Sequence, residues 1–255
     1  MINQPKITGL IITFNEEKNI VSLIENLSFV DEIIVVDSFS TDNTVKLLSQ
    51  YKNIKIVQNK FENYTSQRNF AIKLAKKPWI LFLDADERMP KKLITEIQNE
   101  VLKTETSNAY FFKRKFYFVG KPLNFSGTQN DKNIRLFKNN NAFYDQTKSV
   151  HETLVFDGKP GILNNKLLHY SVTDYDSYLK KMIQYGQLKA QDLFKKGKKY
   201  NILVHWSKTC FKFFKSYIMQ LGFLDGSNGI KICYLQSVSV YETYSYLKKI
   251  EKHNA

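Results

Sequence analysis

The sequence predicts an α/β protein, with a mostly parallel sheet flanked by helices, added mixed strands and a C-terminal helical extension. Two observations lead to this prediction. Over the first hundred residues, short apolar runs alternate with segments whose apolar side chains recur at helical spacing, and repeated strand–helix–strand units form parallel sheets. From about residue 174 onward, the spacing of apolar side chains is helical.

Four strands and the helices that follow them account for the first hundred residues. Pro78 ends the third helix and Pro90 opens the fourth, because proline disrupts a helix interior but fits the first turn. The predicted strands are 7–13, 32–37, 54–57 and 79–83, and the predicted helices are 20–27, 45–48, 65–77 and 90–103.

The remainder of the chain divides into a strand-rich part and a helical part. Residues 109–119 are rich in aromatic and β-branched side chains, and residues 133–137 form another short apolar run. We expect these strands to complete one side of a cleft. Helices are predicted at 180–196 and 203–222. We therefore expect an α/β domain over residues 1–172 and a helical, basic extension over residues 173–255.

The net charge of +14 comes entirely from residues 101–255, because residues 1–100 carry equal numbers of basic and acidic side chains. Such a basic region suits an anionic partner, either nucleic acid or a phospholipid surface. The plainer alternative is a lysine-rich face that only meets solvent.

The segment 203–222 is predicted to be an amphipathic helix. Lys208, Lys212 and Lys215 lie opposite its bulky side chains. Such a helix can lie in a membrane interface, or it can pack on the α/β domain, and the sequence leaves both open. The bulky side is formed by Trp206, Cys210, Phe213, Phe214, Tyr217 and Leu221.

The cysteines and the lengths of the apolar runs indicate the cellular compartment of the protein. Cys210 and Cys233 form no metal-binding spacing and no disulfide framework, which favours a reducing compartment. The N-terminus does not resemble a signal peptide, and no apolar run reaches the roughly 18 residues that span a bilayer. We expect a cytoplasmic protein that associates peripherally with the inner face of the cytoplasmic membrane.

Two carboxylates directly follow the buried strand 79–83. Asp84 and Asp86 form a DxD pattern at the carboxyl end of that strand, where open α/β sheets bind ligands. Carboxylates at this spacing can share Mg²⁺ or Mn²⁺, which in turn holds phosphate oxygens. The pattern alone is weak, since any acidic turn produces it.

Other polar segments are predicted to meet the DxD pattern. Residues 13–17 follow the first strand, residues 37–42 follow the second, and Gln67, Arg68 and Asn69 lie on the helix after the third. Since parallel strands end at one edge, the strand-end groups converge there, and four convergent segments are a stronger signal than one motif.

As a set, these four segments resemble family 2 inverting glycosyltransferases of GT-A fold. Further motifs at 135–137, 150–152, 169–170 and 222–226 resemble the bacterial branch that builds the lipopolysaccharide core, notably β-1,4-glucosyltransferases. The resemblance implies a catalytic domain over residues 1–172 that uses a UDP-sugar and Mg²⁺ or Mn²⁺.

Roles for individual residues follow from the chemistry and the resemblance. Asp37 can accept a hydrogen bond from the uracil imide. Asp86 is expected to ligate the metal, and His169 to complete the metal site or contact diphosphate. His169 as a structural residue, Thr13 or Asn15 as a helix cap, Asp42 as an early-helix carboxylate and Arg68 as a solvated side chain remain alternatives. The expected nucleotide-sugar-binding residues are Thr13, Asn15, Glu16, Asp37, Asp42, Arg68, Asp84 and Ala85.

An inverting transfer also needs a base that takes the proton of the acceptor hydroxyl. Glu152 is the first candidate, and Asp131 and Asp145 are the alternatives. The alternative for Glu152 is a surface carboxylate that pairs with a lysine. Arg135 is expected to pair with an acceptor phosphate or with Glu152.

The predicted function is hexose transfer, glucose by resemblance, from a UDP-sugar to a lipopolysaccharide-core or other cell-surface saccharide. A different polysaccharide or a protein-linked glycan remains an alternative acceptor. A nucleic-acid binding protein is disfavoured because the chain carries no recognisable nucleic-acid motif and holds a convergent acidic site. A nucleotidyltransferase is disfavoured because residues 13–18 contain no glycine.

Overall fold

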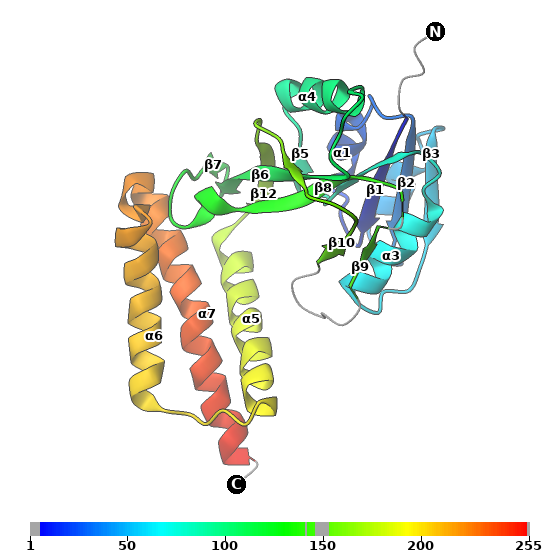
Figure 1. Ribbon diagram of the computed structural model, residues 1–255. Helices are drawn as coiled ribbons and strands as arrows, with labels where there is room; N and C mark the ends of the chain where they lie inside the picture. Colours follow the sequence, from blue (N-terminus) through cyan, green and yellow to red (C-terminus); the bar gives the residue numbers. More distant parts are fainter. Residues whose placement is uncertain (1–5, 141, 146–152, 254–255) are drawn as a thin grey trace. The chain divides into compact units, whose positions relative to one another are not determined.

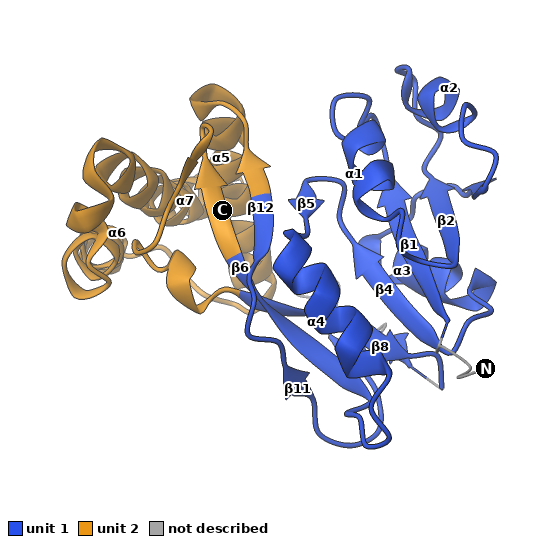
Figure 2. Cartoon of the chain, turned by 90° about the horizontal axis from the view of Figure 1, so that it is seen from above, with its two compact units in different colours: residues 1–114, 132–169 blue, residues 115–131, 170–255 orange. Residues whose placement is uncertain are grey.

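The computed structural model describes residues 6–140, 142–145 and 153–253, and these form two compact units (Figures 1 and 2). The first unit comprises residues 1–114 and 132–169, and the second comprises residues 115–131 and 170–255. The expected division at residue 172 stays a prediction about which segments fold independently.

The first unit contains the predicted α/β alternation. Its helices are α1 (Ile20–Asn26), α2 (Thr44–Leu48), α3 (Tyr64–Leu74) and α4 (Lys91–Val101). Its strands are β1 (Ile7–Thr13), β2 (Glu32–Asp37), β3 (Ile54–Gln58), β4 (Trp79–Leu83), β5 (Glu87–Arg88), β8 (Lys132–Lys138), β9 (Phe143–Tyr144), β10 (Leu154–Val155) and β11 (Gly161–Ile162), with the first parts of β6 (Ala109–Phe118) and β12 (Leu167–Val172).

The sheet has the strand order β3-β2-β1-β4-β8-β6-β12-β5. Neighbours among β3, β2, β1 and β4 are parallel, whereas β8 is antiparallel to both β4 and β6 and β12 is antiparallel to β5. Short β11 joins β6 in parallel, and β9 pairs with β10 separately. The prediction of a mostly parallel sheet with added mixed strands is confirmed.

Alternation along the central strands builds a core on both faces of the sheet. On β4, Leu81 and Leu83 pack with α1 and α4 side chains in one apolar cluster, whereas Ile80 and Phe82 pack with α3 in another. Both sets are buried because successive side chains of a strand point to opposite faces. The apolar runs of the sequence therefore become fully covered strands.

The second unit is mainly helical. It contains α5 (Tyr175–Lys195), α6 (Ile202–Phe214), the π-helix η2 (Lys215–Met219), the 3₁₀ helices η1 (Thr128–Asn130) and η3 (Gly222–Asp225), α7 (Gly226–His253) and short β7 (Lys121–Pro122). Figure 1 shows α5, α6 and α7 side by side. No helix within the described part of the chain is long and apolar enough to cross a membrane.

One carboxylate joins the segment 115–131 to these helices. Asp225 accepts hydrogen bonds from the backbone N–H groups of Asn124 and Phe125, at 2.9 and 3.0 Å, and from the Ser126 hydroxyl at 2.8 Å. This contact gives a structural role to a residue of the 222–226 motif.

Several helix boundaries differ from the sequence prediction. The helix predicted at 65–77 ends at Leu74, because Ala75 is extended and its carbonyl accepts from the Asn139 amide at 3.0 Å. The helix predicted at 203–222 changes to a π-helix after Phe214. The helix predicted at 180–196 begins earlier, at Tyr175, and ends at Lys195.

Candidate active site

Register brings three of the predicted segments to one edge of the sheet. Thr13 at the end of β1 pairs with Asp37 at the end of β2, and Ile11 pairs with Leu83 at the end of β4. The loops that follow these strands therefore begin at neighbouring points. Two further strands contribute to this edge, since Arg135 lies on β8 and His169 on β12.

The loops after β1 and β2 hold each other. Asn15 adopts a left-handed φ of 56°, and its side-chain oxygen accepts from the backbone N–H of Thr41 at 2.8 Å. Asp42 accepts from the backbone N–H of Glu17 at 3.1 Å and also from Thr44. These bonds lower the pKa of Asp42 although desolvation opposes them. The predicted ligand-binding residues Asn15 and Asp42 thus have structural roles in fixing the loops.

Asp37 and Thr13 are buried at the bases of these loops. Asp37 is completely buried, and its carboxylate accepts from Ser40 and from the Gln58 amide. Thr13 is 4% exposed, and its hydroxyl has no hydrogen-bond partner among the described residues. The predicted contact of Asp37 with a base stays a prediction, because Asp37 here organises its own turn.

A buried ion network surrounds the first aspartate of the DxD pattern. Arg68 donates to Asp84 at 2.8 Å, and Arg135 donates to the other carboxylate oxygen of Asp84. Arg135 also donates to Glu87 at 2.8 Å, and Arg114 reaches Glu87 at 3.3 Å. Burial favours the neutral acid, but Arg135 and Arg68 outweigh it and hold the pKa of Asp84 well below its usual range.

Arg68 is positioned by both charge and aromatic rings. Its guanidinium carbon lies 4.8 Å from the Phe82 ring centroid and 5.5 Å from that of Tyr144. Its Nε and Nη1 atoms have no hydrogen-bond partner among the described residues. Since buried donors are nearly always satisfied in native proteins, these N–H groups are suited to an anionic ligand.

The DxD loop is attached to the start of α1 by another arginine. Arg88 donates to the carbonyl oxygens of Ala85 at 2.7 Å, Glu87 at 2.6 Å and Asn19 at 2.6 Å. Ala85 is 6% exposed, so its side chain presents little surface to a ligand. The loop is therefore fixed from both ends, by ion pairs at Asp84 and by Arg88 after Asp86.

Asp86 and His169 lie together at the end of the predicted site. His169 Nε2 is 3.3 Å from a carboxylate oxygen of Asp86, because β12 pairs His169 with Glu87 in β5. No group of three or more His, Cys, Asp or Glu residues suited to a metal occurs in the ranges that the structure describes. Two donors nevertheless fit Mg²⁺ or Mn²⁺ when diphosphate and water supply the remaining ligands.

The pKa of Glu16 responds to the negative charge near Asp86 and His169. Burial raises the pKa of Glu16, and the charges of Asp86 and Asp42 raise it further, although a hydrogen bond from Asn19 opposes the shift. A cation at this edge of the sheet would relieve that repulsion. The electrostatics therefore agree with the donor set.

Of the three candidate bases, Asp131 and Asp145 lie within the residues that the structure describes. Glu152 and its neighbour His151 lie outside the described residues, so Glu152 as base stays a prediction. Asp131 follows η1 and belongs to the second unit. Asp145 lies after β9, and its backbone N–H donates to Thr153 at 3.0 Å.

Sequence reasoning missed Glu87, Arg88 and Arg114. It named Arg68 and Arg135, but it did not predict that both pair with Asp84. The chain has four arginines against thirty-four lysines, and all four arginines bond to residues 84–87. In a chain that supplies exposed charge with lysine, the rare arginines indicate planar ion pairs at buried positions. The scarcity of arginine relative to lysine was therefore the sequence signal that could have identified these ion pairs.

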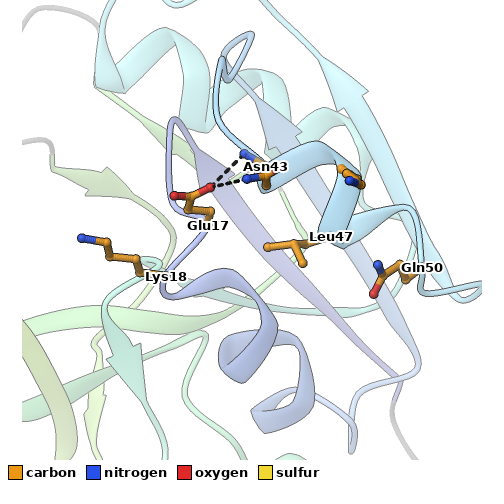
Figure 3. Close-up of a pocket in the computed structure, with 6 residues that line it drawn as sticks. Glu17, Lys18, Asn43, Leu47 and Gln50 are labelled. Carbon is orange, nitrogen blue, oxygen red and sulfur yellow. Dashed lines mark hydrogen bonds between the residues drawn. The ribbon is translucent and has the colours of Figure 1, made fainter.

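A hollow of about 540 Å³ lies beside these loops, lined by Glu17, Lys18, Asn43, Lys46, Leu47 and Gln50 (Figure 3). Glu17 accepts from the backbone and side-chain N–H groups of Asn43 at 3.1 and 2.9 Å. None of Asp84, Asp86 and Arg68 lines it. The candidate site is therefore defined by the charged groups at the strand ends and not by this hollow.

Comparison with known proteins gives a family match and related chains. The model of glycosyl transferase family 2 matches residues 9–157. A lipopolysaccharide core biosynthesis glycosyltransferase, LpsC of Rhizobium meliloti, is 26% identical over 257 residues, covering 96% of this chain and 95% of the relative. An uncharacterized glycosyltransferase of Rickettsia felis is 32% identical and covers 88% of this chain and 83% of the relative.

A solved structure shares the fold. Residues 1–349 of TarS from S. aureus, crystallised with UDP-GlcNAc, align with a TM-score of 0.51 at 15% identity, covering 97% of this chain and 92% of that chain. At this identity the likeness concerns the fold, and the expected GT-A architecture is confirmed.

Proposed function

This chain belongs to glycosyltransferase family 2 and is a glycosyltransferase, and we propose that it transfers a hexose from a UDP-sugar, with inversion, to a cell-surface saccharide. The observation that carries this proposal is the meeting of Asp86 with His169 beside the ion-paired Asp84. This arrangement puts metal donors and an arginine with unused N–H groups at the edge where such sheets bind ligands.

The residues of the first unit have distinct proposed tasks toward the donor. The loops that contain Thr13, Asn15, Glu16, Asp37 and Asp42 hold the base and ribose, and their mutual hydrogen bonds keep that surface preorganised. Arg68 is held by Asp84, so its unused N–H groups are available for a diphosphate oxygen.

A divalent ion held by Asp86 and His169 would supply positive charge against the departing diphosphate. The protein's own contribution is the rigid loop that presents Asp86, because the ion pairs at Asp84 fix its first end and Arg88 fixes its second. Preorganised charge of this kind stabilises a transition state without reorganisation during the reaction.

The base for the acceptor hydroxyl is proposed to be Glu152, with Asp131 next. Glu152→Gln removes the proton acceptor with little change in size, so turnover should fall by about 100-fold or more while UDP-sugar affinity is kept. Steady-state kinetics and calorimetric titration with UDP-sugar separate the two effects. An unchanged turnover would exclude Glu152, and Asp131→Asn would then be measured in the same assay.

The proposed acceptor is a saccharide of the lipopolysaccharide core, with glucose as the transferred sugar. The similarity to LpsC over nearly its whole length supports this acceptor class. A different polysaccharide or a protein-linked glycan is the alternative acceptor. Purified core oligosaccharide and unrelated glycans, offered with the same donor, distinguish them.

The second unit is proposed to meet an anionic membrane surface. An exposed apolar stripe supports this role, since α6 and the turns after it leave large side chains in solvent and the surplus positive charge lies in residues 101–255. The exposed apolar stripe consists of Leu203, Trp206, Phe211, Phe214, Ile218 and Leu221. Of the face predicted from sequence, Phe213 and Tyr217 instead pack with the apolar cluster of the helical unit.

Asp86→Asn tests the central proposal. The substitution removes one negative donor with little change in shape, so Mn²⁺ affinity in the presence of UDP should fall at least about 10-fold and sugar transfer about 100-fold. A panel of UDP-, GDP- and dTDP-sugars, with and without MnCl₂, gives the donor class, and calorimetry gives metal affinity.

Asp157→Asn is the matched control, because Asp157 is an exposed carboxylate in the turn after β10. Its activity and metal affinity should equal those of the wild type. Normal metal-dependent turnover in Asp86→Asn would refute the metal assignment, and failure of every nucleotide sugar to bind would refute the donor.

A further inference from the structure

A second cavity, of about 430 Å³, lies wholly within the helical unit. It opens beside α6 and the carboxyl-terminal half of α7, the two adjacent helices of Figure 1. Its lining consists of Tyr200, Ile202, His205, Trp206, Tyr241, Ser245, Lys248, Lys249 and Lys252. The composition is unusual, because aromatic rings and lysines are combined and none of these lining residues is acidic.

The aromatic part of the cavity is built around one imidazole. The His205 ring centroid lies 4.7 Å from that of Tyr241 and 5.7 Å from that of Trp206, with which it stacks. Trp206 is half exposed and Tyr241 is also exposed. Flat rings of this kind present apolar faces that suit the C–H surface of a sugar ring.

His205 carries an unused polar atom. It is 5% exposed, its Nδ1 lies 3.4 Å from the Tyr200 hydroxyl, and its Nε2 has no hydrogen-bond partner among the described residues. A buried polar atom without a partner is unfavourable and uncommon. A hydroxyl group of a ligand in the cavity would satisfy it.

The lysines supply the charge. Lys248 and Lys252 are one helical turn apart on α7, so they lie on the same face as Tyr241 and Ser245. The Lys248 ammonium lies 5.2 Å from the Tyr200 ring centroid, which places positive charge beside the aromatic wall. Two ammonium groups at this spacing suit a phosphate monoester.

We propose that this cavity binds a phosphorylated sugar ring, with the ring on Trp206 and Tyr241, a hydroxyl at His205 and the phosphate at Lys248 and Lys252. The ligand is either a free sugar phosphate or the phosphorylated headgroup of a lipid, which share this chemistry. The site belongs to the helical unit, so its occupancy does not depend on the proposed transfer reaction.

The test uses the full chain labelled with 5-fluorotryptophan, because its two tryptophans are Trp206 in the cavity and Trp79 in the first unit. Glucose 6-phosphate should shift the ¹⁹F resonance of Trp206 saturably and leave that of Trp79 unchanged. Glucose or inorganic phosphate alone should bind at least about three-fold more weakly, because each keeps only part of the contacts. Trp206→Phe assigns the two resonances.

Two double variants distinguish binding in the cavity from non-specific attraction to the positive charge of the surface. Lys248→Gln with Lys252→Gln should weaken glucose 6-phosphate binding at least about five-fold. Lys180→Gln with Lys231→Gln removes the same charge from exposed positions outside the lining and should leave binding unchanged. His205→Phe should reduce affinity for glucose 6-phosphate but not for phosphate.

A second arm presents a phosphorylated, hydroxylated six-membered ring on a lipid, as phosphatidylinositol 4-phosphate in phosphatidylcholine vesicles. If Lys248 and Lys252 are needed for binding both glucose 6-phosphate and the vesicles, the proposal is supported and the ligand is either free or lipid-borne. If they are needed only for binding the vesicles, the ligand is a lipid headgroup. Absence of lysine-dependent binding in both arms, or equal weakening by both double variants, would overturn the proposal.

Discussion

The two units differ in which of their side chains occupy an unfavourable environment. In the first unit, charged groups are buried, with Glu87 completely enclosed and Arg135 only 3% exposed. In the second unit, large apolar groups are in solvent, with Leu203 77% and Phe214 52% exposed. Buried charges need opposite charges around them, whereas a contiguous exposed apolar surface indicates a partner. The buried Glu87 and Arg135 therefore have opposite charges within the first unit, whereas the exposed apolar side chains of α6 are suited to a partner outside the chain.

Arg135→Met should have the largest effect, because it leaves Asp84 and Glu87 with fewer opposite charges in the protein interior. We expect the free energy of unfolding to fall by about 3–5 kcal/mol, as is typical when one partner of a buried pair is removed. Urea denaturation of wild type and variant at pH 7 measures the difference.

Lys132→Met on the same strand is the control for Arg135→Met. Lys132 is exposed and contributes a contact of 4.8 Å to the Phe111 ring centroid, so its loss should cost no more than about 1 kcal/mol. If both variants lose the same stability, the buried ion network contributes little, and the contrast between the two units fails.

The buried network also shows where sequence reasoning stops. The apolar runs and strand-end polar residues predicted the α/β fold and brought Thr13, Asp37 and Asp84 to one edge. Glu87 could not be placed by the same reasoning, because only the pairing of β5 with β12 and the approach of Arg114 and Arg135 explain its burial. These contacts join segments that are distant in the sequence, and the spacing of apolar residues does not predict such contacts.

The second unit shows a different limit. Periodicity predicted an amphipathic helix at 203–222, but it could not decide which side would be covered. In the structure His205 and Ser216 are buried, Lys212 is half-buried, and Phe214 is exposed. Burial lowers the pKa of Lys212, and Lys215 adds to the effect. The burial of one side depends on packing against α7, which a single helical projection does not contain.

The exposed apolar stripe gives the second prediction. Leu203→Ser with Phe214→Ser should reduce association with anionic phosphatidylglycerol vesicles about ten-fold, because insertion of each side chain is worth roughly 1 kcal/mol or more. Replacing Lys208 and Lys215 by Glu should also weaken it, and more strongly at low salt. Co-sedimentation with vesicles measures both effects.

Phe143→Ser in the first unit is the matched control, since Phe143 is also about half exposed. Its association with vesicles should equal that of the wild type. Should all these variants sediment with vesicles as the wild type does, the exposed stripe would have no membrane role, and a protein partner would become the better explanation for it.

Glu16→Gln should have the smallest effect, and it tests whether the first unit leaves one charge uncompensated. Burial and the neighbouring carboxylates raise the pKa of Glu16 in the folded protein, so its ionised form destabilises the fold at any pH above that folded value. In metal-free buffer the variant should therefore be more stable than the wild type at pH 7. The advantage should disappear as the pH falls below the unfolded value of about 4.3, where Glu16 is protonated in both states. Urea denaturation between pH 4 and 8 measures this difference, and a variant less stable than the wild type at pH 7 would show that the Asn19 hydrogen bond, and not the repulsion, dominates at Glu16.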